Sequence, residues 1–184
     1  MPRQLKPACP EFDRSRLELL PLDQRRHDLD ISVILPLVAP AYCHPALRAT
    51  AARIRQARAQ GAAVVLMMGA HVLRAGVQRY LIDLMERGLI SSLAMNGACV
   101  IHDFELALTG ATTESVACYI EAGRFGLWQE TSRINDIVAR AAAQGQGLGE
   151  TIGEAIENGD FPHREISIFA AGHRLRYRLR ASQL

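Results

Sequence analysis

The fold is decided by two apolar stretches that each end in a turn of small residues, AVVLMMG at residues 63–69 and ISSLAMNGA at residues 90–98. Between them, apolar side chains recur with helical spacing from position 77 to position 85, and Gly88 stands where such a helix would end. A strand, a helix and a second strand within about 35 residues predict a βαβ unit, because parallel strands need a crossover of this kind. We therefore predict an α/β fold with a Rossmann-like parallel sheet and flanking helices.

The rest of the chain divides into an N-terminal arm, residues 1–29, and a single Rossmann-like domain, residues 30–184. The arm is polar and contains prolines, whereas the domain carries further apolar segments with helical spacing. Helices are expected over residues 46–60, 100–108, 131–143 and 148–157.

Two further segments are predicted from their side-chain chemistry. The hydroxyl-rich stretch Thr112-Thr113-Glu114-Ser115 is expected to cap a helix that follows it. Near the C-terminus, four arginines alternate with apolar residues, at Arg174, Arg176, Arg178 and Arg180. A period of two predicts a half-buried edge strand whose arginines oppose pairing with another edge. A strip that binds anions or nucleic acid is the alternative.

Composition bounds the class of protein. A chain of 184 residues is large enough to fold as one domain without metal or disulfide staples, and its net charge of +2 is too small to suggest nucleic-acid binding. No segment approaches the ~20 continuous apolar residues of a membrane span. Residues 1–15 lack the apolar region of an export signal, and the four cysteines lack the paired spacing of a zinc site. Reduced thiols and a cytoplasmic location are therefore expected, with no membrane or nucleic-acid partner.

Lysine is nearly absent, since Lys6 is the only lysine among 21 basic residues. Two explanations stay open: a GC-rich genome that favours arginine and alanine, or a protein whose chemistry uses no lysine in its core. The chain also lacks the Gly-Lys-Ser/Thr of a P-loop and the Gly-x-Ser-x-Gly elbow of a hydrolase. A P-loop is thereby excluded, and a hydrolase triad has no evident nucleophile.

A candidate site follows from the two predicted strands. Open α/β sheets bind ligands beyond the carboxyl ends of their strands, and here those ends carry the turns Gly69-Ala70-His71 and Asn96-Gly97-Ala98. A strand-end turn that opens a helix presents free backbone N–H groups, which suit a phosphate or pyrophosphate. The alternative is that both are ordinary turns, since Gly and Asn tolerate positive φ.

Three polar residues, His102, Asp103 and Glu105, fall on the first turn of the helix expected after the second strand. Carboxylates there are favoured by the helix dipole whatever the function, by about 0.3–1 kcal/mol each. The functional alternative is that Asp103 or Glu105 binds a cationic amine or a ribose hydroxyl. A third interpretation is a metal-dependent enzyme that uses His71, His102 and Asp103. The sequence offers no further ligands for it, so no metal site is predicted.

Six short stretches carry a resemblance to a known family. They are GAHV at 69–72, IDLMERG at 82–88, NGA at 96–98, IHDFE at 101–105, TTESVA at 112–117 and GRFGLWQET at 123–131. Together they resemble the deoxyhypusine synthase family, most closely its bacterial deoxyhypusine synthase-like members, over about residues 20–172.

The resemblance implies a Rossmann-like, NAD-dependent aminoalkyl transferase that takes an aminobutyl group from spermidine. A polyamine or another small amine is then the expected partner, NAD the cofactor, and a homo-oligomer, a tetramer in the family, the expected assembly. By position, the cofactor-binding residues are Gly69, Ala70 and His71 in the first turn, Asn96, Gly97 and Ala98 in the second, and His102 and Asp103 after it. His102 stands where the family has one of two paired acids.

One departure from the family is large. The family's imine-forming lysine lies in a C-terminal half that this chain does not match, and Lys6 lies in the arm. Because imine chemistry needs a correctly placed lysine, no catalytic residue is predicted. The chain is expected to be the NAD- and polyamine-binding portion of such a transferase, truncated relative to the family and not competent alone. The alternative is a non-catalytic α/β binding or oligomerisation module.

Overall fold

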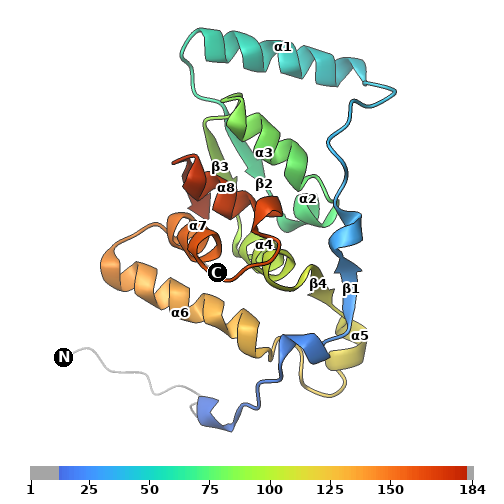
Figure 1. Ribbon diagram of the computed structural model, residues 1–184, viewed down its shortest axis with the longest axis vertical. Helices are drawn as coiled ribbons and strands as arrows, with labels where there is room; N and C mark the ends of the chain where they lie inside the picture. The colour runs from blue at the N-terminus through green and yellow to red at the C-terminus, as the bar shows by residue number, and fades with distance from the viewer. Residues whose placement is uncertain (1–12, 182–184) are drawn as a thin grey trace, which may run out of the picture.

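A three-stranded parallel sheet lies at the centre of the molecule, as the computed structural model of residues 13–181 shows (Figure 1). Its strands are β2 (Val65–Met68), β3 (Ser92–Met95) and β5 (Arg178–Ala181), in the order β2-β3-β5. The partner of Met68 across the β2–β3 pair is Met95, so the two strands end at the same edge of the sheet. This parallel register confirms the predicted βαβ unit and the Rossmann-like α/β class.

The crossover between β2 and β3 consists of two helices. The short helix α2 (Ala70–Arg74) begins directly after β2, and α3 (Gln78–Glu86) follows it. The apolar residues of α3 point inward, with Leu81, Ile82 and Met85 all buried. The amphipathic pattern that predicted this helix therefore also predicted which of its faces packs against the core.

Further helices surround this unit. Their bounds are α1 (Pro45–Ala59), α4 (Gly97–Thr109), α5 (Val116–Tyr119), α6 (Gln129–Gln144), α7 (Leu148–Asn158) and α8 (Ile168–Arg174). Single 3-10 turns are η1 (Arg14–Arg16), η2 (Leu22–Gln24), η3 (Ile31–Val33) and η4 (Arg164–Ile166). The helices expected at 46–60, 131–143 and 148–157 are present within two residues of those limits, and the one expected at 100–108 begins three residues earlier.

Helix α4 is the central helix of the core. Most of its apolar side chains, among them Val100 and Phe104, are buried, and it packs against α6, α7 and α8. The rings of Phe104 and Phe161 meet edge to face with their centroids 5.0 Å apart. Helices α7 and α8 approach closely at Gly153, where a Cβ would lie 2.4 Å from the carbonyl oxygen of Phe169.

A second, two-stranded sheet corrects one prediction. Strand β1 (His27–Asp30) pairs antiparallel with β4 (Ala111–Glu114), so the stretch from Thr112 to Glu114 is a strand rather than a helix cap. Ser115 does precede the short helix α5, but its side chain makes no capping hydrogen bond. The reason is tertiary, because the partner strand comes from a segment more than 80 residues earlier in the chain.

The predicted C-terminal strand exists over a shorter range. Strand β5 lies at one edge of the parallel sheet, as expected. Arg174, however, belongs to helix α8, where it pairs with Glu157 at 2.7 Å, and Arg176 has a positive φ of 51°. The alternation of arginine and apolar residues therefore describes a strand only from Arg178 onward.

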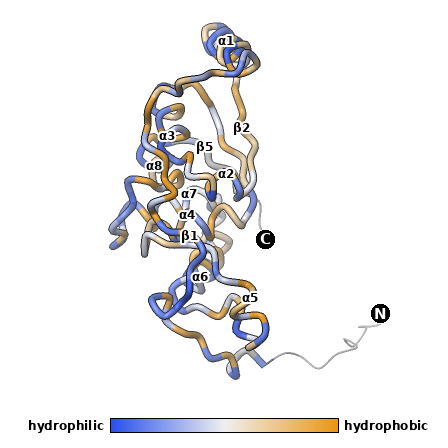
Figure 2. The backbone as a smooth tube through the Cα atoms, turned by 90° about the vertical axis from the view of Figure 1, so that its right-hand side faces the viewer, coloured by the Kyte–Doolittle hydropathy of each residue, from blue (hydrophilic) through white to orange (hydrophobic). Residues whose placement is uncertain are grey.

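Helix α1 and one face of the sheet are more exposed than the rest. Helix α1 has no buried residue and lies at the end of the molecule farthest from α5 (Figure 1). Arg58 ties it to the body by donating to the carbonyl oxygen of Gly88 at 2.7 Å and to Ser91 Oγ at 3.0 Å. Strand β2 is strongly hydrophobic (Figure 2), yet Val65 and Met67 are exposed on its outer face. In residues 13–181 no helix is long and apolar enough to cross a membrane.

Candidate functional site

The two predicted turns lie side by side at the carboxyl edge of the sheet. Gly69 is the N-cap of α2 and Asn96 is the N-cap of α4, each directly after its strand. A Cβ built on Gly69 would lie 3.8 Å from Nδ2 of Asn96, so the turns are in van der Waals range of one another. Two helix starts therefore share one edge, which is where open α/β sheets bind ligands.

The start of α4 is shaped to receive hydrogen-bond acceptors. The Asn96 side chain accepts from the backbone N–H of Cys99 at 3.3 Å and so caps one of the free donors of the first turn. The remaining first-turn amides, at Gly97 and Ala98, have no acceptor within a helix, as at any helix start. They are the donors that the sequence analysis assigned to a phosphate.

Basic side chains on α2 lie next to this edge. His71 is exposed, whereas Arg74 is half-buried, and its Nε atom is buried without a hydrogen-bond partner in the described part of the chain. A buried donor without an acceptor is costly, so an anionic group that reached Arg74 would be stabilised there.

His102 lies on α4 between several charged groups. Burial is the main cause that lowers the pKa of His102 below its usual value of 6.5. Glu105 opposes this shift, while Arg74 and Arg25 add to it. The imidazole is thus held neutral at neutral pH, in a position where the sequence analysis expected a cofactor contact.

Asp103 points away from the turns. Its carboxylate accepts hydrogen bonds from Ser167 Oγ at 2.5 Å and from the backbone N–H groups of Ile168 and Phe169 at 3.0 and 3.3 Å. It is 1% exposed and caps helix α8. Because three donors already occupy this buried carboxylate, we leave Asp103 out of the proposed site.

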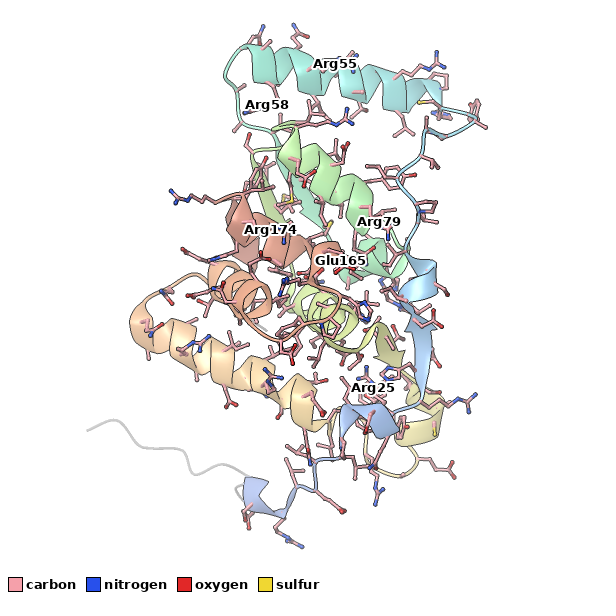
Figure 3. The ribbon with its side chains drawn as sticks, viewed as in Figure 1. Arg25, Arg55, Arg58, Arg79, Glu165 and Arg174 are labelled. Atoms are coloured by element: carbon pink, nitrogen blue, oxygen red, sulfur yellow. The ribbon has the colours of Figure 1, made fainter. Side chains whose placement is uncertain are left out.

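Glu105 pairs with Arg25 of the N-terminal segment, the part of the chain from residue 13 to the start of α1, rather than with a ligand. Its two carboxylate oxygens accept from both terminal nitrogens of Arg25, at 2.7 and 2.6 Å, in a bidentate pair whose side chains are 2% and 3% exposed. Hydroxyl groups of Thr112 and Thr131 complete its shell at 2.7 and 2.8 Å. Figure 3 shows Arg25 where the N-terminal segment meets the body.

A cavity of about 670 Å³ lies beside this ion pair. One face of α4, the start of α6, the end of β4 and the loop before Trp128 line it together with the N-terminal segment. Of the predicted site residues only Ala98 and His102 reach it. Its other polar walls come from Arg25, Glu105, Thr113, Glu114, Thr131, Ser132 and Asn135.

Glu114 and Trp128 form one wall of the cavity. The indole Nε1 of Trp128 donates to Glu114 at 2.8 Å, and the backbone N–H of Gly126 donates to it at 2.9 Å. The Arg25 guanidinium lies over the Trp128 ring, 5.6 Å from its centroid. No ligand-binding role was predicted for any of these residues from the sequence, and Glu114 was predicted only as part of a helix cap. A signal was present, because Glu114 and the single tryptophan both lie in stretches that carried the family resemblance.

Metal binding has no support in the part of the chain that the structure describes. No group of three or more His, Cys, Asp and Glu side chains there could hold a metal ion. The trio His71, His102 and Asp103 does not converge, because Asp103 faces α8 while His71 is exposed on α2. The thiol of Cys99 is buried, and burial raises its pKa.

Known proteins resemble this chain in sequence and in fold. A family model described as "Arginine dihydrolase ArgZ-like, C-terminal, Rossmann fold" matches residues 48–158, more than half of the chain. Among solved structures, the apo crystal structure of ArgZ, an arginine dihydrolase from the ornithine–ammonia cycle in Cyanobacteria, is similar with a TM-score of 0.50 at 20% identity. The similarity covers 74% of this chain but only 18% of ArgZ, and it shows the fold alone. No curated protein matches significantly.

These matches correct the assignment to deoxyhypusine synthase, which was wrong, and with it the expected spermidine-dependent transferase lacking its catalytic half. The physical reason lies in the residues that carried the resemblance. Asn96 caps α4, Asp103 caps α8 and Glu105 anchors Arg25, so this stretch builds and fixes a helix after a strand. Such a stretch identifies a βα unit rather than an activity. The chain belongs to the family of ArgZ-like arginine dihydrolase C-terminal domains with a Rossmann fold.

Proposed function

We propose that this domain binds a dinucleotide, NAD, at the carboxyl edge of the parallel sheet. The observation that carries the proposal is the contact between the turns at Gly69 and Asn96, each of which ends a parallel strand and opens a helix. Pyrophosphate groups bind at such helix starts because free N–H groups and the helix dipole both favour negative charge.

The residues at this edge fit a pyrophosphate. Gly69 lacks a side chain where a Cβ would fill the space next to Asn96, which leaves the backbone of both turns open to a ligand. Arg74 offers a buried Nε donor without a partner in the described residues, and His71 adds a second basic group on the same helix. Bound NAD would supply a hydride acceptor, while Gly69–His71 and Asn96–Ala98 would hold its phosphates.

The structural relative suggests a context for this proposed function. The structural relative is an arginine dihydrolase, and this chain matches a small part of it. In a protein of that kind we propose that a domain like this one is the nucleotide-binding part. Binding of a polyamine or another small amine, assembly as a homo-oligomer and a cytoplasmic location stay predictions.

Calorimetric titration of the purified chain with NAD tests the proposal, with Arg74→Gln as the informative variant. We expect saturable binding that weakens about tenfold in Arg74→Gln, because one charge-assisted hydrogen bond to a phosphate is lost. Arg79→Gln is the matched control, since Arg79 is exposed on the neighbouring helix α3 (Figure 3) and should change affinity less than twofold. Absence of any binding heat at millimolar NAD would refute the proposal.

A further inference from the structure

We propose that the cavity beside Arg25 is a second binding site, for a small and mainly apolar molecule whose hydroxyl or amino group donates to Nε2 of His102. The proposal does not rest on the dinucleotide site, because the cavity shares only Ala98 with the strand-end turns, and its polar walls lie on the N-terminal segment, α4, β4 and α6.

The size and lining of the cavity suit a small organic ligand. Ligand pockets in proteins usually enclose about 300–1,000 Å³ and are lined by apolar side chains with a few polar groups, and this one encloses about 670 Å³. The apolar walls are Leu17, Leu19, Ala98, Ile101, Val116, Phe125, Leu127, Trp128 and Ile134. A mainly apolar molecule would therefore replace water at these walls favourably.

The hydrogen bonds around Thr112 fix the tautomer of His102. The hydroxyl of Thr112 donates its single hydrogen to Glu105 at 2.7 Å. Toward Nδ1 of His102, at 2.8 Å, the same oxygen can only accept. Nδ1 therefore carries the hydrogen, and Nε2 of the neutral ring is left with a lone pair on a side chain that lines the cavity.

The hydrogen bonds that join Glu105, Thr112 and His102 form a relay, and further contacts of Glu105 hold this relay in place. Glu105 is fixed by the bidentate Arg25 pair and by the hydroxyl of Thr131, so the acceptor that orients Thr112 cannot easily turn. A precise binding site requires that the residues in contact with the ligand are themselves fixed by further hydrogen bonds. His102 is thus presented as a fixed hydrogen-bond acceptor.

Thr113 adds an independent observation at the same cavity. Its φ of 62° lies in the left-handed region, which a β-branched residue rarely adopts. Its Oγ1 is buried and has no hydrogen-bond partner in the part of the chain that the structure describes, although the residue lines the cavity. Strained residues of this kind cluster at ligand sites, and the orphaned hydroxyl offers a ligand a second polar contact.

The charge of the cavity excludes an acidic ligand. Arg25 and Glu105 neutralise each other, whereas Glu114 is satisfied only by the neutral N–H donors of Gly126 and Trp128. Within the described residues, no cation lies in ion-pair range of Glu114. A carboxylate ligand would be repelled there, so the site selects a neutral or cationic donor group.

Fluorescence of Trp128, the single tryptophan and part of the cavity wall, provides the test. Three probes of similar size are titrated into the purified chain: 2-phenylethanol, 2-phenylethylamine and phenylacetate. We expect a saturable change with the alcohol or the amine, and at least fivefold weaker binding of phenylacetate. The stronger of the two donors then names the ligand class. No saturable change with either donor, or equal binding of phenylacetate, would overturn the proposal.

Variants of the relay separate a hydrogen bond from mere space in the cavity. His102→Leu and Thr112→Val should each weaken binding of the more tightly bound donor probe at least fivefold. Thr112→Ser should bind this probe as the unchanged chain does, because the hydroxyl is kept. His173→Leu is the matched control, since His173 is also half-buried but does not line the cavity. Equal affinity in His102→Leu and in the unchanged chain would contradict the proposal.

A measurement on the unchanged chain covers the case in which a variant fails to fold. Nitrogen-15 NMR of the imidazole distinguishes the two tautomers, and we expect His102 to carry its hydrogen on Nδ1 and to shift at Nε2 when the donor probe is added. The opposite tautomer, or no shift at Nε2, would refute the assignment. Arg74 does not line the cavity, so Arg74→Gln should weaken NAD binding about tenfold while changing probe binding less than twofold. The NAD site and the cavity site can therefore be confirmed or refuted separately.

Discussion

The carboxylate of Asp103 accepts a hydrogen bond from Ser167, a residue 64 positions later in the chain, with 2.5 Å between Oδ2 and Oγ. The same carboxylate accepts the first backbone N–H groups of α8. One side chain of the central helix thus fixes the start of another helix across the core. The charge sits in a fully buried position, and burial raises the pKa of Asp103 to about 6 despite these three donors.

This buried carboxyl makes stability depend on pH. Between about pH 4 and pH 6, Asp103 keeps its proton in the folded chain and loses it in the unfolded chain, so its contribution to the free energy of unfolding falls as pH rises. The side chain at position 103 cannot ionise in Asp103→Asn, so this variant lacks the pH dependence that Asp103 gives to the free energy of unfolding. We expect the cost of this substitution to be larger at pH 4 than at pH 7, by at most roughly 3 kcal/mol for a shift of about two pKa units.

Urea unfolding of both chains across this pH range checks the prediction. Asp136→Asn is the control, because Asp136 is exposed on α6 and its substitution should cost little at either pH. If Asp103→Asn costs as much at pH 7 as at pH 4, burial does not raise the pKa of Asp103 in the folded chain.

The contrast between local and distant contacts explains how much the sequence could predict. The βαβ unit was predictable because its strands, helix and closing glycine lie within one short segment with a clear period. The pairing of β1 with β4, the Arg25–Glu105 ion pair and the Asp103–Ser167 cap join segments 64 or more residues apart, and no local period reports them. Among the candidate site residues, the sequence placed both turns at one edge but could not tell a carboxylate that binds a ligand from one that caps a distant helix.

The ion pair between Arg25 and Glu105 should behave as a unit. Removing one partner of a buried pair leaves an uncompensated charge, so we expect Arg25→Met or Glu105→Gln alone to lower the free energy of unfolding by about 3–5 kcal/mol. The double variant should cost clearly less than the sum of the two. Denaturant unfolding of the four chains at pH 7 gives the coupling directly, and strictly additive costs would show that the pair is not formed in solution.

The histidine of the cavity gives a prediction of opposite sign to that of Asp103. Burial lowers the pKa of His102, so below about pH 6.5 the unfolded chain binds a proton that the folded chain resists. Stability from this group is present above pH 6.5 and is lost as pH falls through that value. Proton NMR of the imidazole should show the pKa of His102 below 6.5. A pKa of His102 at or above 6.5 would contradict the burial of this ring.

Two glycines with positive φ test how the N-terminal segment lies on the body. Gly76 (φ 76°) ends the turn between α2 and α3, and a Cβ there would lie 1.8 Å from the carbonyl oxygen of Val33. Gly88 (φ 62°) needs the same backbone conformation, but a Cβ there would meet nothing within 4 Å. Gly88→Ala should therefore cost only the backbone strain of about 1–2 kcal/mol.

Gly76→Ala adds a steric clash to the same strain, and because the clashing atom belongs to the backbone it cannot be relieved by a rotamer change. We expect its cost to exceed that of Gly88→Ala by at least about 3 kcal/mol, measured by urea unfolding. The hydrogen bond from the Leu35 N–H to the Gly76 carbonyl at 2.8 Å would be lost with the same displacement, which adds to the difference. Equal costs for the two substitutions would mean that the segment around Val33 does not cross the α2–α3 turn in solution.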